Sequence, residues 1–512
     1  MRLNRGLRLR KQWFYPLSLL GVIILSTFVF SYNLGRDFFE DEYQVNSTAY
    51  GYLQTGDFFL WDWIGNRPED AGLDRSGDGY YPRAWPHTAL VALSYSLFGV
   101  SEESSRIISI LFSVIFVGTS YFFTRFFIGR NDVALGVAFS LALSSSVIVV
   151  QAQYTRMYAL LAPLFLLFAW SVYRGITEKS IKSPQNGVQR YLERNCNFHF
   201  GYLGLSLGLL ALNYTIHINS LVLLPATYLF VLYLAVTSRE RRYVFLVGVG
   251  AIALLVLTYI AQNSPTLEHI TYRLTPFRSR NLRYLDFVVG YPVRQIGTVL
   301  LFAGLAGSFF IKDKELKNRR IFLYSIVGFT LCFFVLIADR YAAYKYTSHV
   351  MPIGLALVLA AFFYVIGRIR SAAGRGLSCG LFVGWIIYLY VANFGVVYGD
   401  ENDRAHYSEA YATIVDTFNP GQDVIFGQYL RDFYLQDLPP ETKVISMLNR
   451  RRYTLEQFQA DLSMEQSGFV TWASRKEQHL SKELRQYIHE TSRHLHGTGV
   501  DDTKVEVYYF EN

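Results

Sequence analysis

The chain has 512 residues, of which 52% are hydrophobic and 17% aromatic, and several of its uncharged runs are long enough to cross a bilayer. One soluble core does not use so much apolar sequence, so the composition excludes an ordinary soluble domain and indicates a polytopic membrane protein. The formal net charge is +8, but most Lys and Arg residues stand between apolar runs, where membrane topology explains them without nucleic-acid binding.

The first apolar run, residues 13–32, follows a basic N-terminus and precedes no small-residue cleavage site. We therefore expect a retained anchor with a cytoplasmic N-terminus. An acidic cluster with Asp41 and Glu42 follows directly, so its carboxylates lie at a membrane surface, where they can do chemistry. The alternative is an ordinary solvated helix start. The amphipathic stretch at residues 43–61 argues against that alternative, because it keeps the chain near the interface.

The apolar segment at residues 84–100 is predicted to be an interfacial helix and not a span. If it crossed, the later basic segments would lie opposite the basic N-terminus, against the positive-inside rule. Hydropathy predicts eleven spans: residues 13–32, 107–128, 133–150, 157–173, 200–216, 218–236, 243–261, 292–311, 321–338, 350–366 and 377–397. The basic connections then lie in the cytoplasm, and the odd number of spans leaves the C-terminal tail outside.

The composition changes to that of a soluble domain at about residue 398. Helical patterns alternate with short apolar runs, which predicts a small α/β layer domain. The helical patterns cover residues 407–418, 455–462 and 476–488, and the apolar runs cover residues 423–427, 443–447, 468–472 and 504–510.

The predicted fold class is therefore a polytopic α-helical membrane protein with a small C-terminal α/β soluble domain. Its predicted parts are a membrane domain at residues 1–397, with a first outer loop of interfacial helices at residues 35–103, and an extracytoplasmic domain at residues 398–512. The three cysteines, Cys196, Cys332 and Cys379, have neither metal-site nor redox spacing, so free thiols are expected.

Polar and ionisable groups from several segments face the outer compartment in this topology. Such groups at the ends of spans are candidates for a functional site, because they are costly near hydrocarbon unless they meet a partner or a substrate. The alternative for each is a snorkelling or paired side chain. The candidates are Arg83, His87, Gln153, Arg156, Tyr158, His217, Arg340, Tyr341 and Lys345.

A long outer loop, residues 263–291, carries an excess of arginine that runs against the positive-inside bias. Because the guanidinium fork fits phosphate bidentately, a lipid phosphate or an acidic glycan is its natural ligand. Contact with anionic headgroups of the outer leaflet is the alternative. The arginines are Arg273, Arg278, Arg280 and Arg283.

Short motifs occur in a fixed order along residues 13–400. They are Asp41-Glu42-Tyr43 before a helix ending near Gly56, Pro86-His87, the stretch from Leu97 to Ser101 with Arg106, the stretch from Gln153 to Leu160, the stretch from Tyr214 to His217, and Arg340-Tyr341 with Pro352. This ordered set resembles the GT-C glycosyltransferases, in particular the protein mannosyltransferase and aminoarabinose transferase families.

The resemblance implies a hexosyl- or pentosyltransferase that moves a sugar from a polyprenyl-phosphate carrier to an acceptor hydroxyl, with inversion at the anomeric carbon. Asp41 matches the essential acidic position of the family, and Glu42 is its neighbour. The chemistry asks for a carboxylate as general base and for cations that stabilise the departing lipid phosphate. Arg156 and Arg340 are the candidate cations, and Tyr158 and His87 are candidate positioning groups.

The expected partners are a lipid-linked sugar donor, a glycolipid, polysaccharide or protein acceptor, and the lipids of the plasma (inner) membrane. No nucleotide site is needed, because the donor arrives activated on its lipid, and a divalent metal stays open. Tyr154 stands where related turns often carry an acid, which weakens the case for a metal ligand there. The alternative function is a transporter or flippase of lipid-linked sugars, which would need charges at the midplane of the spans and paired broken helices.

Overall fold

The structure is a computed structural model that describes residues 3–38, 40–68, 79–180, 186–188, 190, 196–238, 240–263, 294–336, 344–392, 407–427, 432–447, 453–473, 480–497 and 505–512. The chain divides into two compact units. Unit 1 comprises Met1–Tyr32, Ser109–Gln153 and Met157–Asn393, and unit 2 comprises Asn33–Ile108, Tyr154–Arg156 and Phe394–Asn512. The segment after the first apolar run thus belongs to the same unit as the C-terminal residues. The domain boundary after residue 397 stays a prediction.

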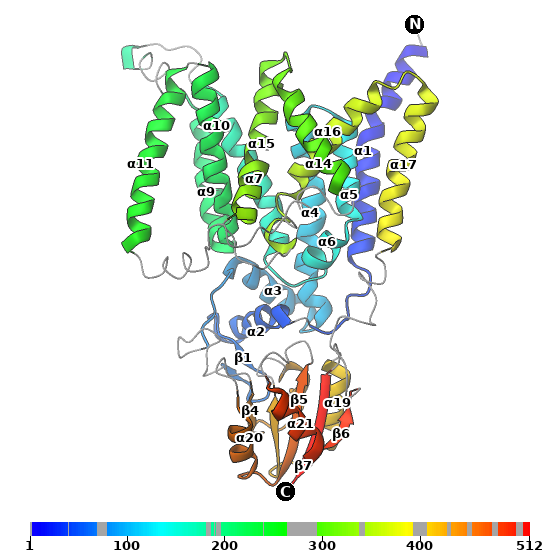
Figure 1. Cartoon of the computed structure of the whole chain (residues 1–512), viewed down its shortest axis with the longest axis vertical. Helices are drawn as coiled ribbons and strands as arrows, with labels where there is room; N and C mark the ends of the chain where they lie inside the picture. The colour runs from blue at the N-terminus through cyan, green and yellow to red at the C-terminus, as the bar shows by residue number, and fades with distance from the viewer. Residues whose placement is uncertain are drawn as a thin grey trace. The chain divides into compact units, whose positions relative to one another are not determined.

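Unit 1 is a bundle of roughly parallel helices (Figure 1). One helix, or two or three consecutive helices, occurs at each predicted span. The elements are α1 (Leu3–Phe30), most of α4 (Glu102–Ile128), α5 (Asn131–Ala142), α6 (Ser145–Val147), the π-helical η1 (Ile148–Ala152), α7 (Tyr158–Thr177), α9 (Phe200–Ile216), the 3₁₀-helical η2 (Ile218–Val222), α10 (Leu223–Ser238), α11 (Arg241–Asn263), α14 (Arg294–Phe309), α15 (Lys314–Leu336), η3 (Tyr344–Tyr346), α16 (Met351–Gly367) and α17 (Ala372–Ala392).

Five helices in the described part of the chain are long and apolar enough to cross a membrane, namely Trp13–Phe30, Glu102–Ile128, Tyr158–Thr177, Ile218–Ser238 and Ala372–Ala392. The pair Asn131–Ala142 and Ser145–Ala152, which bends by 56°, makes a sixth if it is counted as one span. The break falls at Leu143 and Ser144, where a run of serines begins, and serine is a weaker helix former than the apolar residues on either side. These helices identify a membrane protein, and the total of eleven spans stays a prediction.

The N-terminal part of unit 2 contains two helices that pack against each other, α2 (Glu40–Thr55) and α3 (Trp85–Phe98). A short antiparallel pair, β1 (Trp61–Asp62) and β2 (Arg67–Pro68), lies between them in the sequence. α2 and α3 share a buried apolar seam that includes Val45, Ala49 and Val91. Since burying this seam stabilises both helices, it fixes the start of α2 relative to α3.

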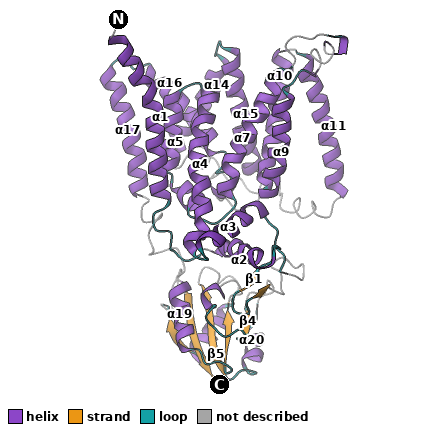
Figure 2. Cartoon of the chain, turned by 180° about the vertical axis from the view of Figure 1, so that it is seen from behind, coloured by secondary structure: helices purple, strands orange, loops and turns teal. Residues whose placement is uncertain are grey.

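The C-terminal part of unit 2 is a five-stranded mixed sheet in the order β4-β3-β5-β7-β6 (Figure 2). β3 pairs in parallel with β4 and β5, and β7 pairs antiparallel with β5 and β6. The elements are α19 (Tyr407–Thr417), β3 (Asp423–Gly427), η4 (Asp432–Leu435), β4 (Val444–Ser446), α20 (Leu455–Leu462), β5 (Ser467–Ala473), α21 (Lys482–Thr491), β6 (Arg493–His496) and β7 (Val505–Glu511).

Helices cover both faces of this sheet, as the alternation of side chains along its strands requires. Val424 and Phe426 on β3 join a core cluster with residues of α20 and α21. Ile425, between them, joins a second cluster with residues of α19. The second cluster also contains Ile64 from the segment after α2, so the N-terminal and C-terminal parts of unit 2 share one apolar core.

Candidate active site at the start of helix α2

An arginine of α4 and a glutamate of α2 form a buried ion pair in unit 2. Arg106 Nε lies 3.1 Å from Glu42 Oε1, and Arg106 Nη2 lies 2.9 Å from Glu42 Oε2. The two side chains are 1% and 0% exposed. This bidentate geometry is the strong form of the arginine–carboxylate interaction, because both hydrogen bonds are charge-assisted.

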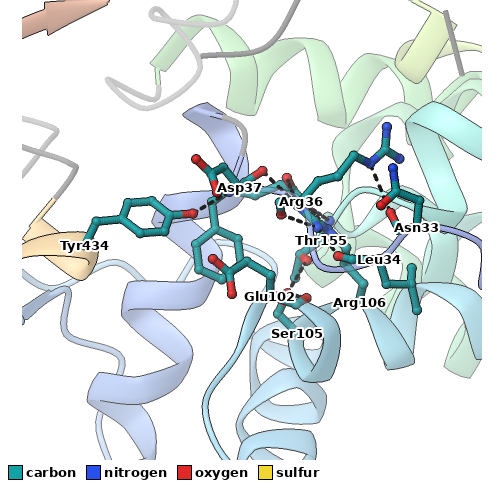
Figure 3. A network of polar contacts seen from close by, with 11 residues as sticks. Asn33, Leu34, Arg36, Asp37, Glu102, Ser105, Arg106, Thr155 and Tyr434 are labelled. Atoms are coloured by element: carbon teal, nitrogen blue, oxygen red, sulfur yellow. Dashed lines mark hydrogen bonds and ion pairs between the residues drawn. The ribbon is translucent and has the colours of Figure 1, made fainter. Parts of the chain in front are cut away.

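The remaining donors of Arg106 bind the chain that leads into α2. Nη1 donates to the carbonyls of Leu34 and Arg36, the second at 2.6 Å, and Nη2 donates to the carbonyl of Asp37 at 3.1 Å (Figure 3). A guanidinium has five N–H groups, so every donor of Arg106 has an acceptor. Arg106 therefore fixes residues 34–37 and the first turn of α2 together.

The Glu42 carboxylate is also tied to the turn before α7. Glu42 Oε1 accepts from the Thr155 N–H at 2.8 Å, and the Thr155 hydroxyl lies 3.0 Å from that of Ser105. A general base needs an oxygen that can accept the substrate's proton, whereas both Glu42 oxygens already accept hydrogen bonds. The geometry thus favours a positioning role for Glu42 over the general-base role predicted for the acidic pair.

Asp41 is the second residue of α2 and immediately precedes Glu42. Contacts that hold the start of α2 therefore also hold the backbone of Asp41 in place. The network around Arg106 does this from α4 and from the turn that contains Thr155.

His87 is a buried, neutral imidazole near the start of α3. The turn before this helix is strained, because Ala84 adopts a φ of 54°. Burial, and to a smaller extent the charge of Arg156, lower the pKa of His87 to about 3. Neither ring nitrogen has a hydrogen-bond partner within the described ranges. A buried polar group of this kind is expected to meet water or a ligand, since leaving it unpaired costs about 1–3 kcal/mol.

Arg83 differs from its neighbour His87, because its side chain is exposed. Its Nη1 lies 3.5 Å from the hydroxyl of Tyr81, which donates to Gln44 Oε1 at 3.1 Å. Gln44 is a residue of α2, so this weaker chain of polar contacts also ends on the helix that carries Asp41.

Three other predicted residues form a second cluster, in unit 1. The rings of Tyr158 and His217 have centroids 5.4 Å apart, and the ring of Tyr346 lies 6.5 Å from the first and 6.4 Å from the second. The Lys345 ammonium lies 5.8 Å from the Tyr346 ring. His217 Nδ1 accepts from the backbone N–H of Asn219 at 3.1 Å, which leaves Nε2 as the protonated nitrogen of a neutral ring.

The comparisons with known proteins are informative at the level of structure. No protein-family model matches the chain, and no curated protein matches its sequence. The structure of ArnT from Cupriavidus metallidurans bound to undecaprenyl phosphate is similar over 97% of this chain and 98% of that chain, with a TM-score of 0.59 and 13% identity. The oligosaccharyltransferase of Archaeoglobus fulgidus tethered with an acceptor peptide is similar over 91% and 70%, with a TM-score of 0.56 and 11% identity.

A second structure from Archaeoglobus fulgidus, AglB in complex with an inhibitory peptide and a dolichol-phosphate, covers 95% of this chain and 73% of that chain, with a TM-score of 0.55 and 11% identity. The chain has the GT-C fold. At such low identity the likeness establishes the fold alone, which agrees with the fold that the ordered motifs indicate. The activity must be argued from the residues.

The structure divides the predicted residues that it describes between the two units. Asp41, Glu42, Arg83, His87 and Arg156 lie in unit 2, whereas Tyr158, His217 and Lys345 cluster in unit 1. Gln153 is buried in unit 1, where its Nε2 donates to the carbonyl of Tyr32 at 2.8 Å. Predicted residues outside the described part of the chain are Arg273, Arg278, Arg280, Arg283, Arg340 and Tyr341.

Two of the groups that hold the start of α2, Arg106 and Thr155, had no role predicted from the sequence. Arg106 appeared only as a member of a motif, although a lone arginine at the edge of an apolar run is itself a signal. Thr155 likewise appeared only inside the stretch from Gln153 to Leu160. Across the described ranges, no group of three or more His, Cys, Asp or Glu residues is arranged to hold a metal ion.

Proposed function

We propose that this GT-C chain is a membrane glycosyltransferase. It moves a sugar from a polyprenyl-phosphate-linked donor to an acceptor hydroxyl at the outer face of the membrane, with inversion at the anomeric carbon. The observation that carries this proposal is the saturated Arg106–Glu42 network, which holds the start of the helix that bears Asp41. The undecaprenyl phosphate and dolichol-phosphate bound to two structures of the same fold support a lipid phosphate as the carrier.

Asp41 acts as the general base in this proposal. The acceptor hydroxyl gives its proton to the Asp41 carboxylate while its oxygen attacks the anomeric carbon from the side opposite the leaving group. The bond between that carbon and the phosphate oxygen breaks, and the lipid phosphate departs with the electron pair. A single displacement of this kind inverts the anomeric centre, and a positioned base contributes about two to four orders of magnitude in rate.

Cations are needed where the phosphate leaves, because its negative charge develops in the transition state. We assign this role to Arg156 and Arg340. Arg156 is only 5% exposed, so its charge acts in an environment of low dielectric constant, where it stabilises an anion more strongly than in water. His87, neutral and buried beside Arg156, offers one N–H donor and one acceptor to a phosphate or sugar oxygen.

The cluster in unit 1 supplies the further binding groups. Tyr158 and His217 present rings and polar tips, and Lys345 adds a charge next to Tyr346. Such a combination suits a sugar or a lipid phosphate, since aromatic faces pack on sugar rings while the ammonium binds anionic oxygen. Tyr341 and Arg83 complete this proposed set, and the arginines of residues 263–291 form the proposed anion-binding loop.

The finer topology belongs to the same proposal. We assign eleven spans, a cytoplasmic N-terminus and an extracytoplasmic C-terminal domain in the plasma (inner) membrane. α3 is the proposed interfacial helix, and the exposed apolar side chains of Trp85, Leu93 and Leu97 support this assignment, with exposed fractions of 46%, 52% and 66%. An apolar helix face next to polar loops is typical of a helix that lies in the plane of the interface.

Mass spectrometry of glycolipids and polysaccharides tests the proposal. Cells that lack the protein should lose one glycosylated product, and the wild-type chain should restore it. Asp41→Asn should not restore it, because the change removes the base while preserving the shape of the side chain. Asp57→Asn is the matched control, since Asp57 is an exposed aspartate shortly after α2. The proposal would be contradicted if cells that contain the protein at its normal level and cells that lack it made identical products.

A further inference from the structure

A tyrosine of the C-terminal part of unit 2 contacts the segment that leads into α2. Tyr434 belongs to η4, and its hydroxyl accepts a hydrogen bond from the Phe38 N–H at 2.8 Å (Figure 3). The carboxylate of Glu102, at the start of α4, interacts with the same hydroxyl. A phenol has one O–H donor and lone pairs that accept, so the hydroxyl can accept from Phe38 while its own proton faces a carboxylate.

A second contact reaches the same segment from α19. Asp37 Oδ2 accepts from the backbone N–H of Ser408 at 2.8 Å and from its hydroxyl at 3.0 Å. Ser408 is the second residue of α19, where backbone N–H groups have no partner within the helix. Asp37 therefore caps α19 from a position 371 residues away in the sequence.

Apolar packing reinforces these polar contacts. Phe38 is 2% exposed and meets the ring of Phe433 at a centroid distance of 5.1 Å, in an edge-to-face arrangement. The ring of Trp63 also packs edge-to-face against Phe433, with their centroids 4.9 Å apart. Phe433 immediately precedes Tyr434, so the packing of the Phe433 ring helps to position the hydroxyl of Tyr434.

The backbone of residues 34–38 is thus fixed from two directions. Arg106 binds the carbonyls of Leu34, Arg36 and Asp37, and Tyr434 binds the N–H of Phe38. Asp41 follows only three residues after Phe38, within the first turn of α2. A displacement of this segment would be transmitted to the start of the helix.

We infer that Tyr434 is a positioning residue for the proposed transfer reaction: by holding the Phe38 N–H it fixes the start of α2, and so Asp41, against the acceptor hydroxyl. The inference rests on the proposed function for the role of Asp41. It gives the C-terminal part of the chain an indirect part in catalysis, through the position of α2. A displacement of about 1 Å is enough to matter, since such misplacement lowers turnover by about a hundredfold.

The test compares Tyr434→Phe with a matched control, Tyr453→Phe. The first change keeps the ring and removes only the hydroxyl that binds the Phe38 N–H. The control removes a hydroxyl from the same unit that binds Asp461 instead. Hydrogen–deuterium exchange of peptides covering residues 33–43 is measured on the full chain in detergent, together with saturation kinetics of sugar transfer.

Tyr434→Phe should raise amide exchange in residues 33–43 by about tenfold and lower turnover by about ten- to a hundredfold, with little change in the Michaelis constant. Tyr453→Phe should change neither quantity. In an Asp41→Asn background, Tyr434→Phe should cause no further loss of turnover, because the base through which it acts is already absent.

Three outcomes would overturn the inference. The first is unchanged exchange in residues 33–43. The second is a loss of turnover by Tyr434→Phe that multiplies with that of Asp41→Asn. The third is an equal rise in exchange across strands β3 and β5, which would show global destabilisation. Exchange does not depend on enzymatic activity, so a chain that shows the exchange change but transfers no sugar refutes the proposed function separately from the positioning contact.

Discussion

Replacing Arg106 by lysine keeps the positive charge and removes the fork of donors. Arg106 makes five hydrogen bonds, two to Glu42 and one each to the carbonyls of Leu34, Arg36 and Asp37. An ammonium has only three N–H donors, so at least two of these acceptors lose their partner. Hydrogen bonds to charged groups contribute about 1.5–3 kcal/mol each, which predicts a destabilisation of about 3–6 kcal/mol for Arg106→Lys.

Two further variants separate geometry from charge. Arg106→Met leaves Glu42 buried without its counter-ion, which should destabilise at least as much, since breaking a buried pair costs about 3–5 kcal/mol before the lost carbonyl contacts are added. Combining Arg106→Met with Glu42→Gln removes both charges and should be more stable than Arg106→Met alone. The control is Arg67→Lys, because Arg67 is 64% exposed and pairs with Asp62 at the surface, where about 0–1 kcal/mol is at stake.

The assay is a denaturant titration of the purified chain in detergent, followed by tryptophan fluorescence. The free energies of unfolding should rank wild type and Arg67→Lys highest, then the double variant, then Arg106→Met. An Arg106→Lys chain that unfolds within about 0.5 kcal/mol of wild type would refute the reasoning, because exposed substitutions without a structural role already vary that much.

Three further predictions concern pH, topology and the arginine loop. His87 stays neutral in the folded chain because its pKa is about 3, whereas the unfolded chain takes up a proton below 6.5, so stability is full above pH 6.5 and falls as the pH drops towards 3. At pH 5 the free energy of unfolding is lower by about 2 kcal/mol than at pH 7. In His87→Phe the free energies of unfolding measured at pH 7 and pH 5 should differ less than in wild type. A tag after Asn512 should be reachable from outside intact cells, whereas labels at Lys182 and Lys314 should not, and a tail reachable only after permeabilisation would contradict the proposed topology. Replacing two arginines within residues 263–291 should raise the Michaelis constant in neutral detergent more than it lowers turnover, and this defect should grow with salt concentration. An unchanged Michaelis constant would refute the hypothesis that these arginines bind a substrate.

Local patterns in the sequence predicted most helices and strands. α9 begins and ends at the predicted residues, and so does α20, where Thr454 and Gln457 form a capping box that marks the helix start. β6 was missed, because residues 493–496 are largely polar and lie at the edge of the sheet, where no apolar alternation is required.

The site was predicted less completely, because its contacts join distant parts of the chain. The position of Asp41 and Glu42 directly after the first apolar run identified them as candidates. Nothing local shows that Glu42 binds Arg106, 64 residues away, or that Phe38 binds Tyr434, 396 residues away. The sequence therefore pointed to the acidic pair as a candidate site, whereas the proposed division into a base, Asp41, and a positioning group, Glu42, rests on the contacts of Glu42 in the structure.

Reconstitution into proteoliposomes tests the central claim most directly. The purified chain is supplied with a polyprenyl-phosphate-linked sugar and a hydroxyl acceptor, and both the glycosylated product and the released polyprenyl phosphate are quantified. Wild type and Asp57→Asn should form both in equal amounts, whereas Asp41→Asn should turn over about two to four orders of magnitude more slowly. Movement of the lipid-linked sugar across the bilayer without transfer, or near wild-type turnover by Asp41→Asn, would contradict the account.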